Sequence, residues 1–252
     1  MSEDWPVLVP VKVLEGQTVS EGVVDLLSTL PVVVLGYHVL PEQTAPGQAR
    51  LQFEEQAQAK LDDLAAAFRD AGGAAESRLV FTHDAEQTLD RIADETGCRA
   101  ILIPNPTPPV QRLLVPVRGE VNVPRLAAFV AAMRGRRDID LTLFHVAETE
   151  DASDDGETLV DDASAALRER GVPPTAISRD IVVSETPVRA IATAAAEDHD
   201  AVVMGESEPS IRTFLFGDPS EQVATQSVGP VIVVRRPRDE SEESETGENA
   251  VE

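Results

Sequence analysis

Cysteine, lysine and aromatic residues are scarce in this chain of 252 residues. Its single cysteine, Cys98, excludes an intrachain disulfide and a cysteine cluster for zinc, and we expect it to be a small buried apolar residue. Lys12 and Lys60 are the only lysines, so arginine supplies almost all of the basic charge. Acids outnumber bases by 45 to 21, and the formal net charge of -24 predicts a halophilic surface that stays hydrated in molar salt.

The same scarcity excludes several functions. With no basic stripe and only 4% aromatic residues, the chain lacks the surfaces that neutralise phosphates and stack bases, so we expect no binding to nucleic acid. No apolar run reaches the roughly 20 residues of a membrane span, and the start MSEDWP has no signal-peptide pattern. These absences predict a cytoplasmic protein without membrane insertion.

Catalytic motifs are missing as well. The sequence has no GxSxG elbow, no complete Walker A loop, no GxGxxG after a strand and no metal-spaced pair of histidines. We therefore expect no enzyme activity, no catalytic residues and no metal site. His38 and His145 occupy equivalent positions in two similar strands, which favours a packing role over catalysis.

An internal repeat organises the chain. VLVPVK (Val7 to Lys12) recurs as LLVPVR (Leu113 to Arg118), and in both copies strands alternate with helical patterns, which predicts parallel sheets. In the first copy we predict strands at 7–12, 31–39, 77–82 and 100–103 and helices at 48–71 and 85–95. In the second we predict strands at 113–118, 140–148, 176–183, 201–204 and 231–234 and helices at 122–135, 157–170, 187–197 and about 219–227.

The first copy stops early. After its fourth strand it has only PNPTPPVQ (residues 104–111), whose four prolines cannot form the missing helix and strand. The sequence thus predicts an α/β protein of two doubly wound parallel-sheet domains, the first (1–109) lacking its last helix and strand and the second (110–238) complete. Residues 239–252 are rich in acids and poor in apolar residues, which predicts a disordered tail.

The stretch GDPSEQVATQSVGPVIVV (Gly217 to Val234) has the order of a loop glycine, a helix, a Gly-Pro turn and a buried strand. Upstream, DAVVMG ends a strand on Gly205. This order resembles the carboxy-terminal third of a universal stress protein domain, and the repeat and charge resemble the tandem-domain haloarchaeal type of that family. The family's phosphate loop has a middle glycine and a final serine or threonine, where this chain has Glu208 and Asp218.

The resemblance also suggests a ligand site. In open parallel sheets ligands bind beyond the carboxyl ends of the strands, where the family holds a nucleoside with an aspartate after the first strand and phosphates with its loop. Here Arg118 replaces that aspartate, and Glu206 adds another acid to the loop. The predicted ligand-binding residues are Arg118, Val146, Gly205, Ser207, Arg212, Gly217 and Ser220. The alternatives are that Arg118 pairs with surface acids and that the glycines only permit turns.

The resemblance implies a stress-related regulatory or scaffold protein whose nucleotide-binding site is degenerate, with ATP binding weak or absent. The alternative is a functional sensor of ATP or another anion that uses the crevice of the second domain; a hydrolase or nucleotidyl-transfer enzyme on the same broad fold is a third hypothesis. Family members often pair their final strands across a dimer. We therefore expect a homodimer through 230–234 and an unidentified regulatory protein partner.

Overall fold

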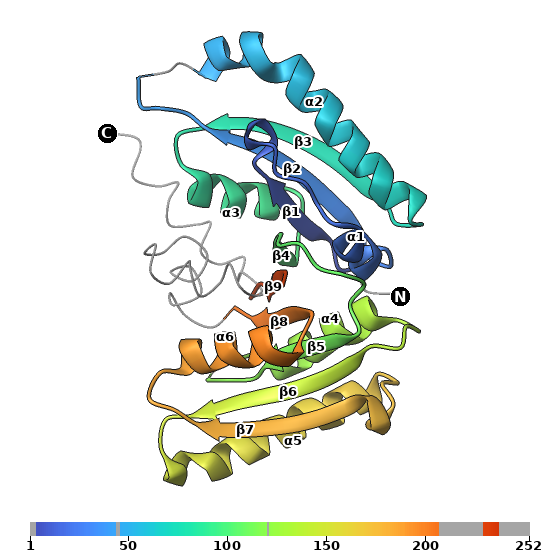
Figure 1. The fold of residues 1–252 in the computed structure, drawn as a ribbon, viewed down its shortest axis with the longest axis vertical. Helices are drawn as coiled ribbons and strands as arrows, with labels where there is room; N and C mark the ends of the chain where they lie inside the picture. Colours follow the sequence, from blue (N-terminus) through green and yellow to red (C-terminus); the bar gives the residue numbers. More distant parts are fainter. Residues whose placement is uncertain (1–3, 44–45, 120, 207–228, 237–252) are drawn as a thin grey trace, which may run out of the picture.

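The computed structural model of the protein describes residues 4–43, 46–119, 121–206 and 229–236, which form one nine-stranded sheet with helices on both faces (Figure 1). The predicted helix at 219–227 and the predicted disordered tail at 239–252 lie outside the described residues.

The elements follow the predicted order. In the first half they are β1 (Val7–Val11), the 3-10 turn η1 (Val13–Glu15), α1 (Glu21–Leu27), β2 (Val32–Val39), α2 (Pro46–Asp70), β3 (Ala75–Thr82), α3 (Ala85–Glu95) and β4 (Ala100–Ile103). In the second half they are β5 (Arg112–Pro116), α4 (Val123–Arg134), β6 (Asp140–Ala147), η2 (Glu150–Ala152), α5 (Ser153–Glu169), η3 (Pro174–Ala176), β7 (Ile177–Val183), α6 (Pro187–Asp198), β8 (Ala201–Gly205) and β9 (Val231–Val234). Predicted bounds in this part of the chain are confirmed to within about one helical turn; the short α1 and the 3-10 turns were missed.

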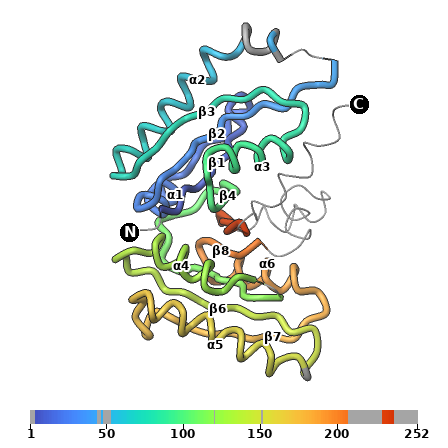
Figure 2. The backbone as a smooth tube through the Cα atoms, turned by 180° about the vertical axis from the view of Figure 1, so that it is seen from behind, coloured from blue at the N-terminus to red at the C-terminus, as the bar shows by residue number. Residues whose placement is uncertain are grey.

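The strand order is β3-β2-β1-β4-β9-β8-β5-β6-β7. Every neighbouring pair is parallel except β4 and β9, which are antiparallel. The doubly wound α/β architecture is confirmed. The two sheets that the sequence predicts are, however, joined into one, because β9 pairs with β8 of its own half and with β4 of the other half (Figure 2).

Strand β9 is therefore not an edge. The sequence predicted that 230–234 would leave an open edge for pairing across a homodimer. Both sides of the strand are instead paired within one chain, and all four of its side chains are buried. The predicted dimer surface is wrong for this physical reason. The first half indeed has no helix or strand between β4 and β5, and the strand it lacks is supplied by the second half.

Helices cover the two faces of the sheet unequally. Side chains of α1, α2, α4 and α5 pack on one face in a hydrophobic cluster that runs through both halves. On the other face, α3 covers β1 and β2 with Leu89 and Ile92, while α6 covers β5, β6 and β9 with Ile191 and Ala195. Because one cluster extends across β9, the halves share a core on the first face.

Side chains also connect the halves. The indole of Trp5, before β1, lies edge-on to Phe129 of α4 with 5.8 Å between ring centroids. The guanidinium groups of Arg99 and Arg125 lie 5.1 and 5.3 Å from the same indole ring, at distances that suit cation–π attraction. Arg99 belongs to the first half and Arg125 to the second, so Trp5 contacts cations from both halves where they meet.

A second cross-connection lies between α1 and α4. Arg137 donates hydrogen bonds to the carbonyl oxygens of Asp25 and, at 2.7 Å, Leu26. Burial lowers the pKa of Arg137, and the nearby charge of Asp25 opposes that change. The arginine therefore lies between the helices in partly dehydrated surroundings, where its donors have acceptors on both sides.

If β9 joins the halves, they should unfold together. The Ile232 side chain is fully buried, and truncation to alanine should cost about 2–5 kcal/mol of unfolding free energy for the complete molecule. Denaturant titration in molar salt, followed by Trp5 fluorescence and by far-UV circular dichroism, should give coincident transitions that shift together. Val183→Ala is the control, because Val183 is 51% exposed. Separate transitions for the two signals would refute the shared-strand interpretation.

Candidate functional site

A crevice lies in the second half at the carboxyl ends of β8 and β9, where α4 begins. The Asn122 side chain caps α4 by accepting a hydrogen bond of 3.0 Å from the backbone N–H of Arg125. The described walls enclose about 10 Å³, which is room for roughly one water molecule. The residues that line this space are Val121, Asn122, Arg125, Leu126, Gly205, Glu206, Val234, Arg235 and Arg236.

Contacts among these residues keep the crevice small. A Cβ atom on Gly205 would lie only 2.3 Å from a methyl carbon of Val121, so that valine already occupies the space above the end of β8. Arg236 donates from its backbone N–H to the Glu206 carboxylate and from Nε to the Glu206 carbonyl oxygen, each at 2.8 Å. Arg125 Nε donates to the Arg235 carbonyl oxygen at 2.6 Å. Both hydrogen-bonded arginines thus hold the end of β9 against the crevice.

The predicted site residues have different positions. Gly205 lines the crevice. Arg118 is 39% exposed and forms an ion pair of 2.8 Å with Glu148. It therefore pairs with a surface acid, as the alternative to ligand binding predicted. The side chain of Val146 is buried at 3% exposure among residues of β6 and α6. Ser207, Arg212, Gly217 and Ser220 lie outside the described residues, as do Glu208 and Asp218. Ligand contact by any of them stays a prediction.

Sequence reasoning missed Val121, Asn122, Arg125 and Arg236. An available signal was the order Asn-Val-Pro at 122–124, since asparagine favours the N-cap and proline the first turn of a helix. That signal places Asn122 and Arg125 at the amino end of α4, beside the carboxyl end of β5. No local pattern indicates that Arg236, far along the chain, joins them.

The equivalent crevice of the first half is filled by the proline-rich connection. A Cβ atom on Gly22, in the first turn of α1, would lie 2.2 Å from the carbonyl oxygen of Pro108. Close by, the backbone N–H of Thr107 donates to the Ser20 hydroxyl at 3.2 Å. Lys12, the counterpart of Arg118, forms a 3.6 Å ion pair with Glu15. The backbone of 107–108 therefore lies where a ligand would approach the amino end of α1.

The histidines expected to pack have packing contacts. His145 is 8% exposed, and its Nδ1 is 2.7 Å from the Val117 carbonyl oxygen. Its ring lies so close to Gly156 of α5 that a Cβ atom there would be 2.4 Å away. His38 lies edge-on to Phe81, with ring centroids 6.3 Å apart. The His145 ring thus fixes α5 against β6 and the end of β5.

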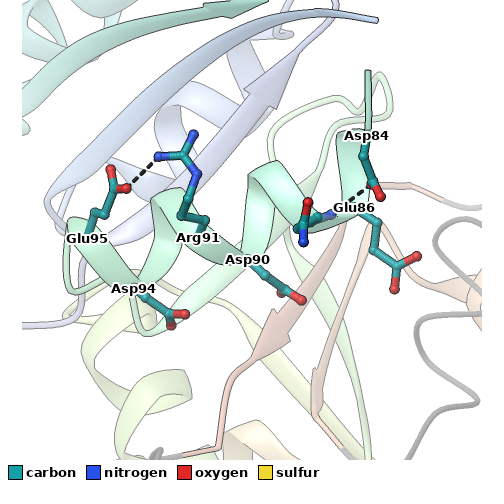
Figure 3. A pocket seen from close by; sticks show the side chains of 7 residues that line it. Asp84, Glu86, Asp90, Arg91, Asp94 and Glu95 are labelled. Atoms are coloured by element: carbon teal, nitrogen blue, oxygen red, sulfur yellow. Dashed lines mark hydrogen bonds and ion pairs between the residues drawn. The ribbon is translucent and has the colours of Figure 1, made fainter. Parts of the chain in front are cut away.

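A larger hollow of about 540 Å³ runs along α3 (Figure 3). Acidic side chains dominate its lining, and Asp90 and Asp94 project from one side of the helix while Arg91 and Glu95 project from the other. Arg91 Nη1 is 2.5 Å from the Glu95 carboxylate. Among the residues that the structure describes, no group of three or more histidine, cysteine or acidic side chains is arranged to hold a metal ion.

Comparison with known families decides the classification. The sequence matches the universal stress protein family over residues 109–235, which are 127 of the 252 residues. The chain belongs to the universal stress protein family.

Two solved structures share the fold of this universal stress protein over 93% of its chain. One from Archaeoglobus fulgidus DSM 4304 is 16% identical, with a TM-score of 0.62 over 93% of this chain and 97% of that chain. A protein of unknown function from Pseudomonas aeruginosa PAO1 is 15% identical, with a TM-score of 0.50 over 93% of both chains. An A. fulgidus universal stress protein in complex with dAMP is 15% identical over 50% of this chain and 96% of that chain, with a TM-score of 0.38. At such identities the likeness concerns the fold alone.

The sequence matches none of the curated proteins. Within the described ranges, no helix is both long enough and apolar enough to cross a membrane.

Cys98 should react slowly in the folded protein. The thiol is buried at 4% exposure, and burial raises its pKa, although a hydrogen bond with Thr96 and the charge of Arg235 act in the opposite direction. Labelling with a thiol reagent at pH 8 in molar salt should be roughly 100-fold slower than in denaturant, because it requires local opening and ionisation. Absorbance of the released thiolate measures both rates; equal rates would show that Cys98 is accessible.

Proposed function

We propose that this universal stress protein is a stress-related regulatory or scaffold protein that acts through contacts with a protein partner and has a degenerate nucleotide-binding site. The observation that carries the proposal is the size of the second-half crevice, whose described walls leave about 10 Å³. The space between the described walls is thus smaller than a phosphate group. The first-half crevice supports the same conclusion, because Pro108 and Thr107 lie against α1.

The charges around the second-half crevice also disfavour nucleotide binding. Glu206 follows β8 directly, and a carboxylate ~5 Å from a phosphate charge repels it by ~3 kcal/mol at an effective dielectric of ~20. Molar salt screens exposed charges and reduces that repulsion. Arg118, where the family has an aspartate, offers donors instead of an acceptor and is already paired with Glu148. These terms favour weak ATP binding or none.

The alternative function is a sensor of ATP or another anion. Its support is the presence of Arg118, Arg125 and Arg236 around the carboxyl ends of β5, β8 and β9. The amino end of α4 adds its partial positive charge at the same place. An anion that displaced the existing partners of these arginines would find donors on several sides.

We further propose that the chain is a tandem-domain, halophilic, cytoplasmic member of the family without enzyme activity. The pairing order of β1 to β4 recurs in β5 to β8, which supports the tandem interpretation. The net charge of -24 supports the halophilic one. A homodimer stays part of the proposal, but it requires a surface other than β9, since both edges of that strand are paired.

ATP affinity should be weak and recoverable. Arg118→Asp restores an acceptor, Glu208→Gly removes an acid, and Asp218→Ser supplies a hydroxyl. Each change removes an unfavourable contribution of ~1 to 3 kcal/mol before screening, so together they should tighten ATP binding by ~100-fold. Isothermal titration calorimetry in molar potassium chloride measures both the unmodified chain and this triple variant. Tight binding by the unmodified chain would refute the degenerate site, and the alternative sensor would then be the better proposal.

Folding should require salt. With 45 acids and 21 bases, repulsion grows as the Debye length rises to ~10 Å at ~0.1 M salt. We expect cooperative unfolding when potassium chloride is diluted from molar concentration to ~0.1 M, measured by far-UV circular dichroism. An osmolyte such as sucrose, which stabilises compact states without screening charge, is the control. A spectrum that does not change on dilution would contradict the halophilic proposal.

A further inference from the structure

The closure of the second-half crevice depends on the last residues of β9 and those just after it. Arg125 donates to the carbonyl oxygen of Arg235, and Arg236 donates twice to Glu206. The backbone N–H of Glu206 in turn donates to the Val234 carbonyl oxygen at 2.7 Å. If residues 234–236 moved away, these four hydrogen bonds would break and the crevice would lose one wall.

The first half holds this segment in place. The Arg235 backbone N–H donates to the Arg99 carbonyl oxygen at 2.8 Å. Its side chain, which is 9% exposed, extends to α3, where Nη1 is 2.8 Å from the Asp94 carboxylate and Nη2 is 3.9 Å from that of Asp90. We call Arg235, Asp90 and Asp94 the anchor. Its acids belong to a helix that is not among the described walls of the crevice.

The anchor is not fully satisfied. Arg235 Nε is buried and has no hydrogen-bond partner within the described part of the chain. Such a buried donor opposes the closed arrangement, because it has lost its hydration without gaining an acceptor. Asp90 and Asp94 also line the hollow along α3, and their side chains are 23% and 35% exposed, so water and ions reach the acid side of the anchor (Figure 3).

We propose that the first half is an intramolecular clamp, and that release of Arg235 from Asp94 and Asp90 opens the second-half crevice to an oxyanion such as a nucleotide phosphate. The ligand class follows from groups that line the crevice, which are the guanidinium groups of Arg125 and Arg236 and the amino end of α4. The inference rests on the proposed function, because it takes the same crevice as the degenerate site and explains what keeps it shut.

The clamp acts by lowering the fraction of molecules whose crevice is open. If only a small fraction of molecules has an open crevice, the apparent dissociation constant is the intrinsic constant divided by that fraction. Weakening the anchor at Asp94, which does not line the crevice, should therefore lower the apparent dissociation constant without any change to a lining residue. We expect at least a ~10-fold decrease, since Asp94→Asn deprives the buried guanidinium of Arg235 of its nearer charged partner.

The test compares variants of the full chain in molar potassium chloride, with ATP as the probe and calorimetry as the readout. Asp94→Asn removes the charge of the nearer acid. Arg235→Met is the second variant, because it replaces the cation with an apolar side chain of similar length and leaves no unpaired buried guanidinium. Glu95→Gln is the matched control, since Glu95 lies on α3 one residue from Asp94 but pairs with Arg91. Circular dichroism confirms that each variant is folded.

The clamp predicts that Asp94→Asn and Arg235→Met bind ATP at least ~10-fold more tightly than the unmodified chain, while Glu95→Gln does not. Faster hydrogen exchange at Glu206 in the first two variants would accompany the opening. If both variants are folded and bind no more tightly, whereas the triple variant described under the proposed function does, the clamp is wrong and the degenerate site stands. Tight ATP binding by the unmodified chain would overturn both.

Discussion

The hydrogen-bond ladder between β4 and β9 is the interaction on which the rest of this structure depends. It pairs Ala100 with Val234 and Ile103 with Val231, and it is the one antiparallel pairing in the described sheet. Without it, β4 would expose a row of unpaired donors and acceptors, and the four-stranded first half would have an open apolar edge. With it, β9 joins the strands of both halves into one sheet. The core on one face then continues from α1 and α2 to α4 and α5.

The antiparallel sense of that ladder decides what surrounds each crevice. It places the amino ends of the first-half strands beside the carboxyl ends of the second-half strands. Trp5 and Arg99, which precede β1 and β4, consequently lie near Arg125 at one edge of the sheet. At the opposite ends of these strands, the Thr107 hydroxyl donates to the carbonyl oxygen of Asp200. The carboxylate of Asp200 accepts from the backbone N–H groups of Gln111 and Arg112. Each half therefore borders the crevice of the other.

Much of the fold could be predicted because its signals are local. Buried strands such as β1 are continuous apolar runs, and α3 has an apolar face and an aspartate cap at Asp84 that fix its bounds. The partner of β9 could not be predicted in the same way. Its sequence is equally suited to pairing with β4, to pairing with another copy of the chain, or to remaining an unpaired edge. Four apolar residues do not specify which strand lies beside them. The crevice residues could not be predicted for a related reason, because Arg236 and Arg125 come together only in the tertiary fold.

The position of β9 late in the chain also has a consequence for synthesis. Residues 100–103 leave the ribosome long before residues 231–234, and 128 residues separate Ile103 from Val231. At about 5–20 residues per second, the edge of β4 stays uncovered for roughly 6 to 26 seconds. The nascent first half is thus an incomplete sheet with an unpaired apolar edge during about half of translation.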